Sequence, residues 1–148
     1  MNILPKAKFL RYQSIFHQKV MATPYTIELE VVRVSTDFMD EDGGFSLEKF
    51  VGDSPRTSTT HKFKALYEKE ISDRTREKYG LPREVNGIVY LSPKQLVPVF
   101  GDYHLDWNTT KIHFEGRVQV VNKIVYLEEL YNSCVGVQIF VRDDNKGG

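Results

Sequence analysis

Apolar and polar residues alternate with a period of two in several short runs along the chain, and this pattern predicts β-strands. The run 25–35 alternates most regularly, with Ile27, Leu29 and Val31 on one face and polar residues between them. The run 134–142 alternates in the same way, which is typical of a half-buried strand. Together with three shorter apolar runs, the pattern predicts strands at 25–35, 86–91, 111–114, 117–126 and 134–142.

Turn residues separate these runs. Only Glu115-Gly116 lies between the strands predicted at 111–114 and 117–126, which is the length of a tight two-residue hairpin. Asn86-Gly87 is a turn dipeptide that leads into the strand 86–91. Many short strands joined by turns indicate a small barrel or sandwich.

A short helix is predicted directly after residue 91. Ser92 is placed as the N-cap, Pro93 as the first helical residue and Gln95 as the residue that completes a capping box. Pro98 should end this helix after about a turn and a half, because a proline ring cannot continue the hydrogen-bond ladder.

The N-terminal segment has apolar residues at spacings of three and four, which predicts a helix with an apolar stripe. Phe9, Tyr12 and Phe16 belong to this stripe, and Thr23-Pro24 ends it. Two interpretations stand side by side. The helix packs on its own domain, or it is an arm that docks on a neighbouring subunit.

About fifty residues, 36–85, show no sheet pattern and are predicted to form a long inserted loop. Its first half is an acidic turn around residues 37–44. Asp37 to Glu48 spans the twelve positions of a calcium loop, but apolar residues occupy ligand positions and the loop glycine falls one position late. We therefore expect a solvated acidic turn.

The second half of this insertion is basic, and a short helix is predicted within it around residues 62–76. Its charges have two interpretations: the solvated face of a helix, or a surface that faces phosphates. The candidate phosphate-facing residues are Arg56, Lys62, Lys64, Lys69, Arg74 and Arg76.

The predicted fold class is mainly β: a small antiparallel β-barrel or sandwich with a long inserted loop, a short helix and an N-terminal helical arm. The predicted organisation is an N-terminal arm at 1–22, a single barrel-like domain at 23–142 that carries the inserted loop 36–85, and a polar tail at 143–148. A length of 148 residues with 41% apolar content suits one such domain.

Charge and cysteine content narrow the function classes. The twenty basic and twenty acidic residues cancel, so the overall charge gives no argument for nucleic-acid binding. The single cysteine, Cys134, excludes a disulfide within the chain and is expected to be a small buried apolar residue. No apolar run is long enough to span a bilayer, and we expect neither a signal peptide nor a membrane partner.

No pattern of catalytic or metal-binding residues stands out. The four histidines share no spacing that predicts a metal centre. Asp102 and Asp106 flank His104 beside Trp107, which suggests an acid–base cluster, although such residues more often form turns. The sequence predicts no enzyme, no catalytic residue, no cofactor and no metal.

The order of these elements resembles the head-completion, or stopper, proteins of tailed bacteriophages. The resemblance rests on Tyr90-Leu91-Ser92-Pro93-Lys94-Gln95-Leu96 after a short strand, and on Phe114-Glu115-Gly116-Arg117-Val118-Gln119-Val120 before a final strand. It covers residues 25–142. Such proteins form rings in the neck of the virion, between the portal or its adaptor and the tail, where a loop helps to retain packaged double-stranded DNA.

The resemblance implies a homo-oligomeric ring that is assembled in the host cytoplasm and located in the virion neck. Its partners would be other copies of the chain, a portal or adaptor protein, a tail or tail-terminator protein, and DNA. The six cations named above would face the DNA channel. Contacts with neighbouring subunits are assigned to Phe9, Tyr12, Phe16 and Trp107.

Two other hypotheses belong to different function classes. The first is a small oligonucleotide-binding barrel that stacks single-stranded nucleic acid on Tyr103, Trp107 and Tyr126. The second is an enzyme with a site near His104.

Overall fold

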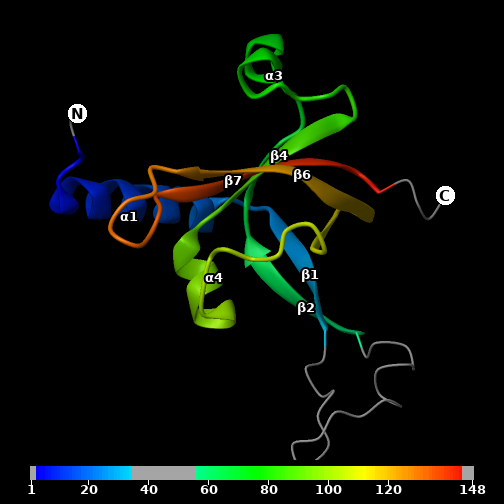
Figure 1. Cartoon of the computed structure of the whole chain (residues 1–148), viewed down its shortest axis with the longest axis horizontal. Coiled ribbons are helices and arrows are strands. Elements are labelled where there is room, and N and C mark those ends of the chain that lie inside the picture. Colours follow the sequence, from blue (N-terminus) through cyan, green and yellow to red (C-terminus); the bar gives the residue numbers. More distant parts are fainter. Residues whose placement is uncertain (1–2, 35–55, 145–148) are drawn as a thin grey trace, which may run out of the picture.

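The structure is a computed structural model that describes residues 3–34 and 56–144. Figure 1 shows the helices of these residues arranged around one curved sheet. The helices are α1 (Lys6–Ala22), α3 (Asp73–Tyr79) and α4 (Pro93–Phe100). The strands are β1 (Thr26–Val34), β2 (Arg56–Lys64), β3 (Leu66–Glu68), β4 (Val85–Leu91), β5 (Lys111–Phe114), β6 (Arg117–Leu127) and β7 (Gly136–Asp143). Within the described ranges, no helix is both long and apolar enough to cross a membrane.

The strands form one antiparallel sheet in the order β2-β1-β5-β6-β7-β4-β3. The predicted fold class is therefore confirmed, although the sheet is not closed into a barrel by strand pairing. All five predicted strands are present. Glu115-Gly116 forms the predicted two-residue hairpin, with Phe114 paired to Arg117 and a left-handed backbone at both turn residues.

The two ends of the strand order are joined by a single residue, Ala65, which lies between β2 and β3. The sheet must therefore curl until its first and last strands meet. Side chains that are distant in the strand order then touch inside the curl: the Tyr67 ring of β3 stacks on the Phe114 ring of β5, with 4.2 Å between centroids. The Tyr67 hydroxyl also donates a 2.8 Å hydrogen bond to Oε1 of the buried Gln119 on β6.

Gly87 explains how Tyr67 fits into this interior. A Cβ atom at Gly87 would lie 2.6 Å from the Tyr67 hydroxyl oxygen, which is too close for any other residue. Residues 86–87 are therefore part of β4, with a register shift between Val85 and Gly87. The interpretation of Asn86-Gly87 as a turn was wrong, because the glycine makes room for a packed ring.

Strand β7 is buried on both faces, which corrects the prediction of a half-buried strand. One face contributes Val137, Ile139 and Val141 to the main core. The other face contributes Phe140 to a second cluster, where the ring of Tyr79 from α3 lies 5.0 Å from it. Strand β7 also extends to Asp143, so the predicted polar tail begins later than residue 143.

The predicted loop 36–85 is wrong over its second half. Residues 56–64 pair along their whole length with β1, from Val34 opposite Arg56 to Thr26 opposite Lys64. Residues 62–64 belong to this strand, so the helix predicted at 62–76 is also wrong; the helix here is α3, with Ser72 as its N-cap. The acidic turn 37–44 and the terminal residues 145–148 lie outside the described residues.

Helix α1 packs on its own domain, as the simpler interpretation predicted. Gln13 donates hydrogen bonds to the Ser133 hydroxyl (2.7 Å) and to the Cys134 carbonyl (2.9 Å). His17 shares a 2.7 Å hydrogen bond with Ser92 Oγ. The Phe16 ring lies directly over Gly136, where any Cβ atom would come within 2.4 Å of the ring.

Helix α4 begins as predicted, with Ser92 accepting a hydrogen bond from the Lys94 amide and Pro93 in the first turn. It continues through Pro98 to Phe100, so the predicted end at Pro98 was wrong. Pro98 removes only one amide donor near the end of a short helix, and the left-handed Gly101 then ends it by donating to the Val97 carbonyl.

The side-chain amide of Gln95 extends the sheet. The Lys64 amide donates to Gln95 Oε1 (3.0 Å), and Gln95 Nε2 donates to the Lys64 carbonyl (2.9 Å). Leu66 pairs with Tyr90 in the β3–β4 ladder, so Lys64 would face Ser92 if β4 continued in this register instead of turning into α4. Gln95 therefore acts as one more peptide unit at this position, in place of the predicted capping box.

Replacing Gln95 with alanine should leave both polar groups of Lys64 without their partner, and we expect a loss of about 1–3 kcal/mol in unfolding free energy. Urea denaturation would measure it. Lys94→Ala, at the neighbouring exposed position, is the control and should change stability little. Equal losses in the two variants would contradict the role given to Gln95.

Replacing Gly136 with alanine should drive a methyl group into the Phe16 ring and destabilise the docking of α1, at a cost of about 1–3 kcal/mol. The double variant Gly136→Ala with Phe16→Leu should recover part of this loss, because the smaller side chain vacates the space. Absence of any recovery in thermal or urea unfolding would show that this contact does not limit α1 docking.

Candidate functional site

A surface pocket of about 580 Å³ lies where the loop after α4 meets the turn between β6 and β7. It brings together acidic, aromatic and polar side chains from two parts of the chain. The lining residues are Asp102, Tyr103, His104, Glu129, Leu130, Tyr131 and Asn132. This pocket includes two of the three acid–base candidates of the sequence, Asp102 and His104, so it is the candidate functional site.

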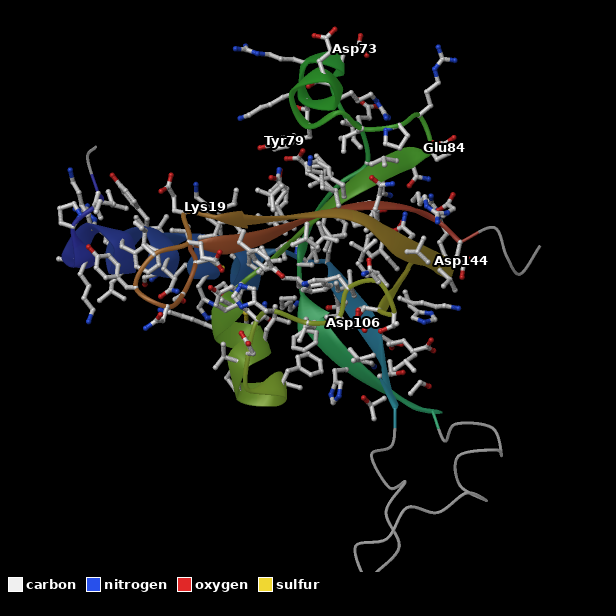
Figure 2. The ribbon with its side chains drawn as sticks, viewed as in Figure 1. Lys19, Asp73, Tyr79, Glu84, Asp106 and Asp144 are labelled. Carbon is white, nitrogen blue, oxygen red and sulfur yellow. The ribbon has the colours of Figure 1, made fainter. Side chains whose placement is uncertain are left out.

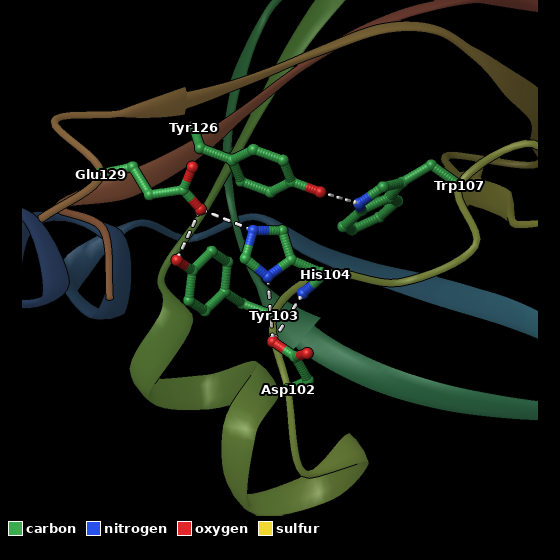
Figure 3. Close-up of polar contacts among 6 residues, drawn as sticks. All are labelled: Asp102, Tyr103, His104, Trp107, Tyr126 and Glu129. Carbon is green, nitrogen blue, oxygen red and sulfur yellow. Dashed lines mark hydrogen bonds and ion pairs between the residues drawn. The ribbon is translucent and has the colours of Figure 1, made fainter. Parts of the chain in front are cut away.

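His104 lies between two carboxylates in this pocket (Figure 3). Its Nδ1 is 3.2 Å from Asp102 Oδ1, and its Nε2 is 2.5 Å from Glu129 Oε2. The same Glu129 oxygen accepts a 2.7 Å hydrogen bond from the Tyr103 hydroxyl. The imidazole is thus fixed at both nitrogens, and Glu129 ties the loop 101–110 to the β6–β7 turn.

Aromatic rings surround the imidazole. The Tyr103 ring lies 4.1 Å and the Tyr126 ring 4.6 Å from the His104 ring, measured between centroids. Tyr126 in turn accepts a 2.9 Å hydrogen bond from the Trp107 indole (Figure 3). The cluster is therefore tightly packed and connects α4's trailing loop with β6.

The β6–β7 turn has an unusual backbone. Glu128, Tyr131 and Asn132 all have φ between 46° and 59°, in the left-handed region that non-glycine residues seldom adopt. The turn is held in this shape by its contacts: the Tyr131 hydroxyl donates to the Leu4 carbonyl at 2.6 Å, and the Tyr131 ring contacts the Phe9 ring edge-on. The turn thus links the pocket to the start of α1.

Two groups in the pocket have shifted pKa values, Asp102 and Tyr103. The His104 backbone amide, which donates to Asp102 Oδ1 at 3.1 Å, lowers the pKa of Asp102 below its usual value. Burial, followed by the hydrogen bond to Glu129, raises the pKa of the Tyr103 hydroxyl above its usual range. Tyr103 is therefore a hydrogen-bond donor at any physiological pH.

Chemically, the cluster holds the two ring nitrogens of His104 between two carboxylates. A nucleophile would have to come from a neighbouring group, and burial raises the pKa of the Cys134 thiol to about 12. Among the residues that the structure describes, no group of three His, Cys, Asp or Glu side chains has the arrangement of a metal site. The geometry fits a group of hydrogen bonds that joins two loops better than it fits a proton-transfer site.

The structure spreads the six cations proposed to face DNA over several elements. Lys62 forms an ion pair with Glu28, and Lys69 with Glu115. Lys64 donates to the Thr23 carbonyl, and Arg76 donates to the carbonyls of Pro82 and Val85. Each of these four cations therefore stabilises its own fold, which favours the structural interpretation of this charge.

The remaining two cations are Arg74, which is exposed on α3, and Arg56, whose side chain lies outside the described part. The six positions thus extend along the chain from the start of β2 to α3, and their role toward DNA stays a prediction.

The four residues assigned to subunit contacts differ in how far they are buried. Phe9 is fully buried and Trp107 is 6% exposed, so these two belong to the protein's own core and offer little surface to a neighbouring subunit. Phe16 is partly buried over Gly136, and Tyr12 is 43% exposed. For Phe16 and Tyr12 the assignment stays a prediction.

Sequence patterns found part of this pocket. Asp102 and His104 were predicted neighbours, whereas Asp106 serves its turn through its carbonyl, which accepts from the hydroxyls of Thr109 and Thr110. Glu129 was missed because it lies 25 residues from His104. No local signal marks a partner at such a distance.

Two comparisons with known proteins bear on the identity of this chain. No protein-family model matches it, and no curated protein matches its sequence. The function is therefore argued from the residues and the fold alone.

Cys134 should react with a thiol reagent only after the protein unfolds. With a pKa of about 12, only roughly one thiol in ten thousand is ionised at pH 8, and the side chain is fully buried. We expect negligible labelling by an aromatic disulfide reagent in buffer and complete labelling in guanidinium chloride. Fast labelling of the native protein would contradict the packing described around Cys134.

Proposed function

We propose that this chain is a structural component of the neck of a tailed bacteriophage. It would form a ring between the portal or adaptor protein and the tail, close the filled head, and help to retain the packaged double-stranded DNA. Its place would be the virion neck, after assembly in the host cytoplasm.

One observation carries this proposal: the pairing of Val34 with Arg56 at the end of the β1–β2 ladder. The chain leaves β1 and re-enters β2 at adjacent points, so the curled sheet presents segment 35–55 from a fixed base. The resemblance implied a retaining loop, which we expected at 36–85. We now assign that loop to segment 35–55, with the paired strands β1 and β2 at its base.

The charge of this segment bears on how DNA would be retained. Residues 35–55 contain six acidic and one basic side chain, so the remainder of the chain carries a surplus of five positive charges. An acidic segment repels phosphates. We therefore propose that retention is steric.

The sheet also offers an edge for assembly. Strand β2 is the outermost member of the order, and its residues Ser58, Thr59 and Thr60 are exposed. Edge strands with unpaired backbone groups are usually covered by another element or another chain. In a ring, an adjacent subunit would supply that cover.

The residues on which the oligonucleotide-binding alternative depends do not expose free ring faces for stacking. Tyr103 is 4% exposed and Trp107 is 6% exposed, while the Tyr126 hydroxyl is bonded to the Trp107 indole. Stacking platforms for single strands require an exposed ring face. A structural role therefore has the better support.

The purified chain should form a closed ring, alone at high concentration or together with its portal or adaptor protein. Native mass spectrometry and negative-stain electron microscopy would detect it, and genes for portal, capsid and tail proteins should flank its gene. A chain that stays monomeric under all these conditions contradicts the proposal. Tight, salt-dependent binding of single-stranded DNA by the monomer would favour the alternative instead.

A further inference from the structure

The outward side of α1 carries basic and apolar residues and no acidic ones. The first acidic residue of the chain is Glu28, so every charged side chain of α1 is positive. These side chains are Lys6, Lys8, Arg11 and Lys19. Such uniform charge on one helix contrasts with the balanced charge of the whole chain.

Two neighbouring stripes run along this helix. Phe9, Gln13, Phe16 and Val20 follow the spacing i, i+4, i+7, i+11 and face the sheet. The residues one position earlier follow the same spacing and form the outer stripe: Lys8, Tyr12, Ile15 and Lys19. Tyr12 is 43% exposed and Ile15 39% exposed, so two large apolar side chains lie between two lysines on the surface.

Only Lys19, in the last turn, complements the negative C-terminal end of the helix; the lysines at its start do not stabilise the helix itself. The N-terminal end of a helix carries a partial positive charge and favours acidic side chains, whereas α1 begins with Lys6 and Lys8 and has no acidic residue in its first turn. Pro5 provides no side-chain cap. Within residues 3–34 and 56–144, no carboxylate forms an ion pair with Lys8 or Lys19. The outer stripe is therefore suited to an anionic, partly apolar partner.

The same chain contains a sequence of that composition. Segment 35–55 combines its six acidic residues and single lysine with six large apolar residues. The apolar residues are Phe38, Met39, Phe45, Leu47, Phe50 and Val51. Acidic groups would face Lys8 and Lys19, and apolar groups would cover Tyr12 and Ile15.

We propose that segment 35–55 of one copy docks on the outer stripe of α1 of a second copy, an inference that rests on the proposed ring. In Figures 1 and 2, α1, with Lys19 labelled, lies on the opposite side of the molecule from the end of the β1–β2 pair. A contact between two different patches of successive copies is head-to-tail, and such contacts generate rings. The segment would then bridge adjacent subunits.

Photocrosslinking tests this contact directly. p-Benzoylphenylalanine replaces Tyr12, and assemblies are formed from a mixture of ¹⁴N- and ¹⁵N-labelled chains. Mass spectrometry of the crosslinked peptides should show Tyr12→p-benzoylphenylalanine joined to residues 35–55 in mixed-isotope pairs. Crosslinks that stay within one isotope, or that join other residues, overturn the proposal.

A charge exchange provides the matched variants. Lys8→Glu with Lys19→Glu should weaken assembly at least tenfold, and Asp40→Lys with Asp42→Lys in the same chain should restore it. The control is Lys78→Glu with Arg83→Glu, which makes the same charge change at exposed positions in and after α3. Equal weakening by the control, or failure of the exchange to restore assembly, overturns the contact.

A peptide of residues 35–55 separates this inference from the proposed ring. The peptide is labelled with a fluorophore and titrated with a variant of the protein in which a Gly-Ser linker replaces residues 36–54. We expect it to bind this variant at low salt. Adding Lys8→Glu and Lys19→Glu to the variant should lower the affinity at least tenfold. Binding without rings would leave the contact intact and refute the ring. Rings without peptide binding, or helix binding only to phosphatidylglycerol vesicles, would refute the contact.

Discussion

The covalent link through Ala65 is the constraint on which the rest of the structure depends. Strand β2 pairs with β1 at one end of the sheet order, and β3 pairs with β4 at the other end. One residue cannot span a flat seven-stranded sheet, because neighbouring strands are about 4.8 Å apart. The sheet must therefore curl, and the core of the protein is the interior of that curl.

Two residues, Gln95 and Gly87, complete the curled sheet where backbone pairing between strands stops. The Gln95 amide bonds both backbone groups of Lys64, two residues before Leu66, where the chain has already turned from β4 into α4. On the opposite side of the interior, Gly87 leaves the space that the Tyr67 ring needs to reach Phe114 and Gln119. Both features depend on a residue type that no hydrophobic pattern reveals, a half-buried side-chain amide in one case and a missing side chain in the other.

The sequence was informative where the determining interactions are local. The hairpin at Glu115-Gly116, the N-cap at Ser92 and the stop at Thr23-Pro24 depend on residues within a few positions of each other, and each was predicted. Strand β2 was missed because an exposed edge strand needs few apolar residues, and among its described side chains only Phe63 is a large buried one. The pairs Gln95–Lys64 and His104–Glu129 join residues 31 and 25 positions apart, so only the folded chain brings them together.

Because Val34 pairs with Arg56, the stability of the sheet depends little on which residues make up segment 35–55. Closing a connection between two fixed points depends only weakly on its length, since each doubling adds about 0.6 kcal/mol. The same scaffold can therefore accept connections of different length and charge between these two residues. Related proteins adapted to different neighbours could keep this curled sheet unchanged and vary mainly in that exchangeable insert.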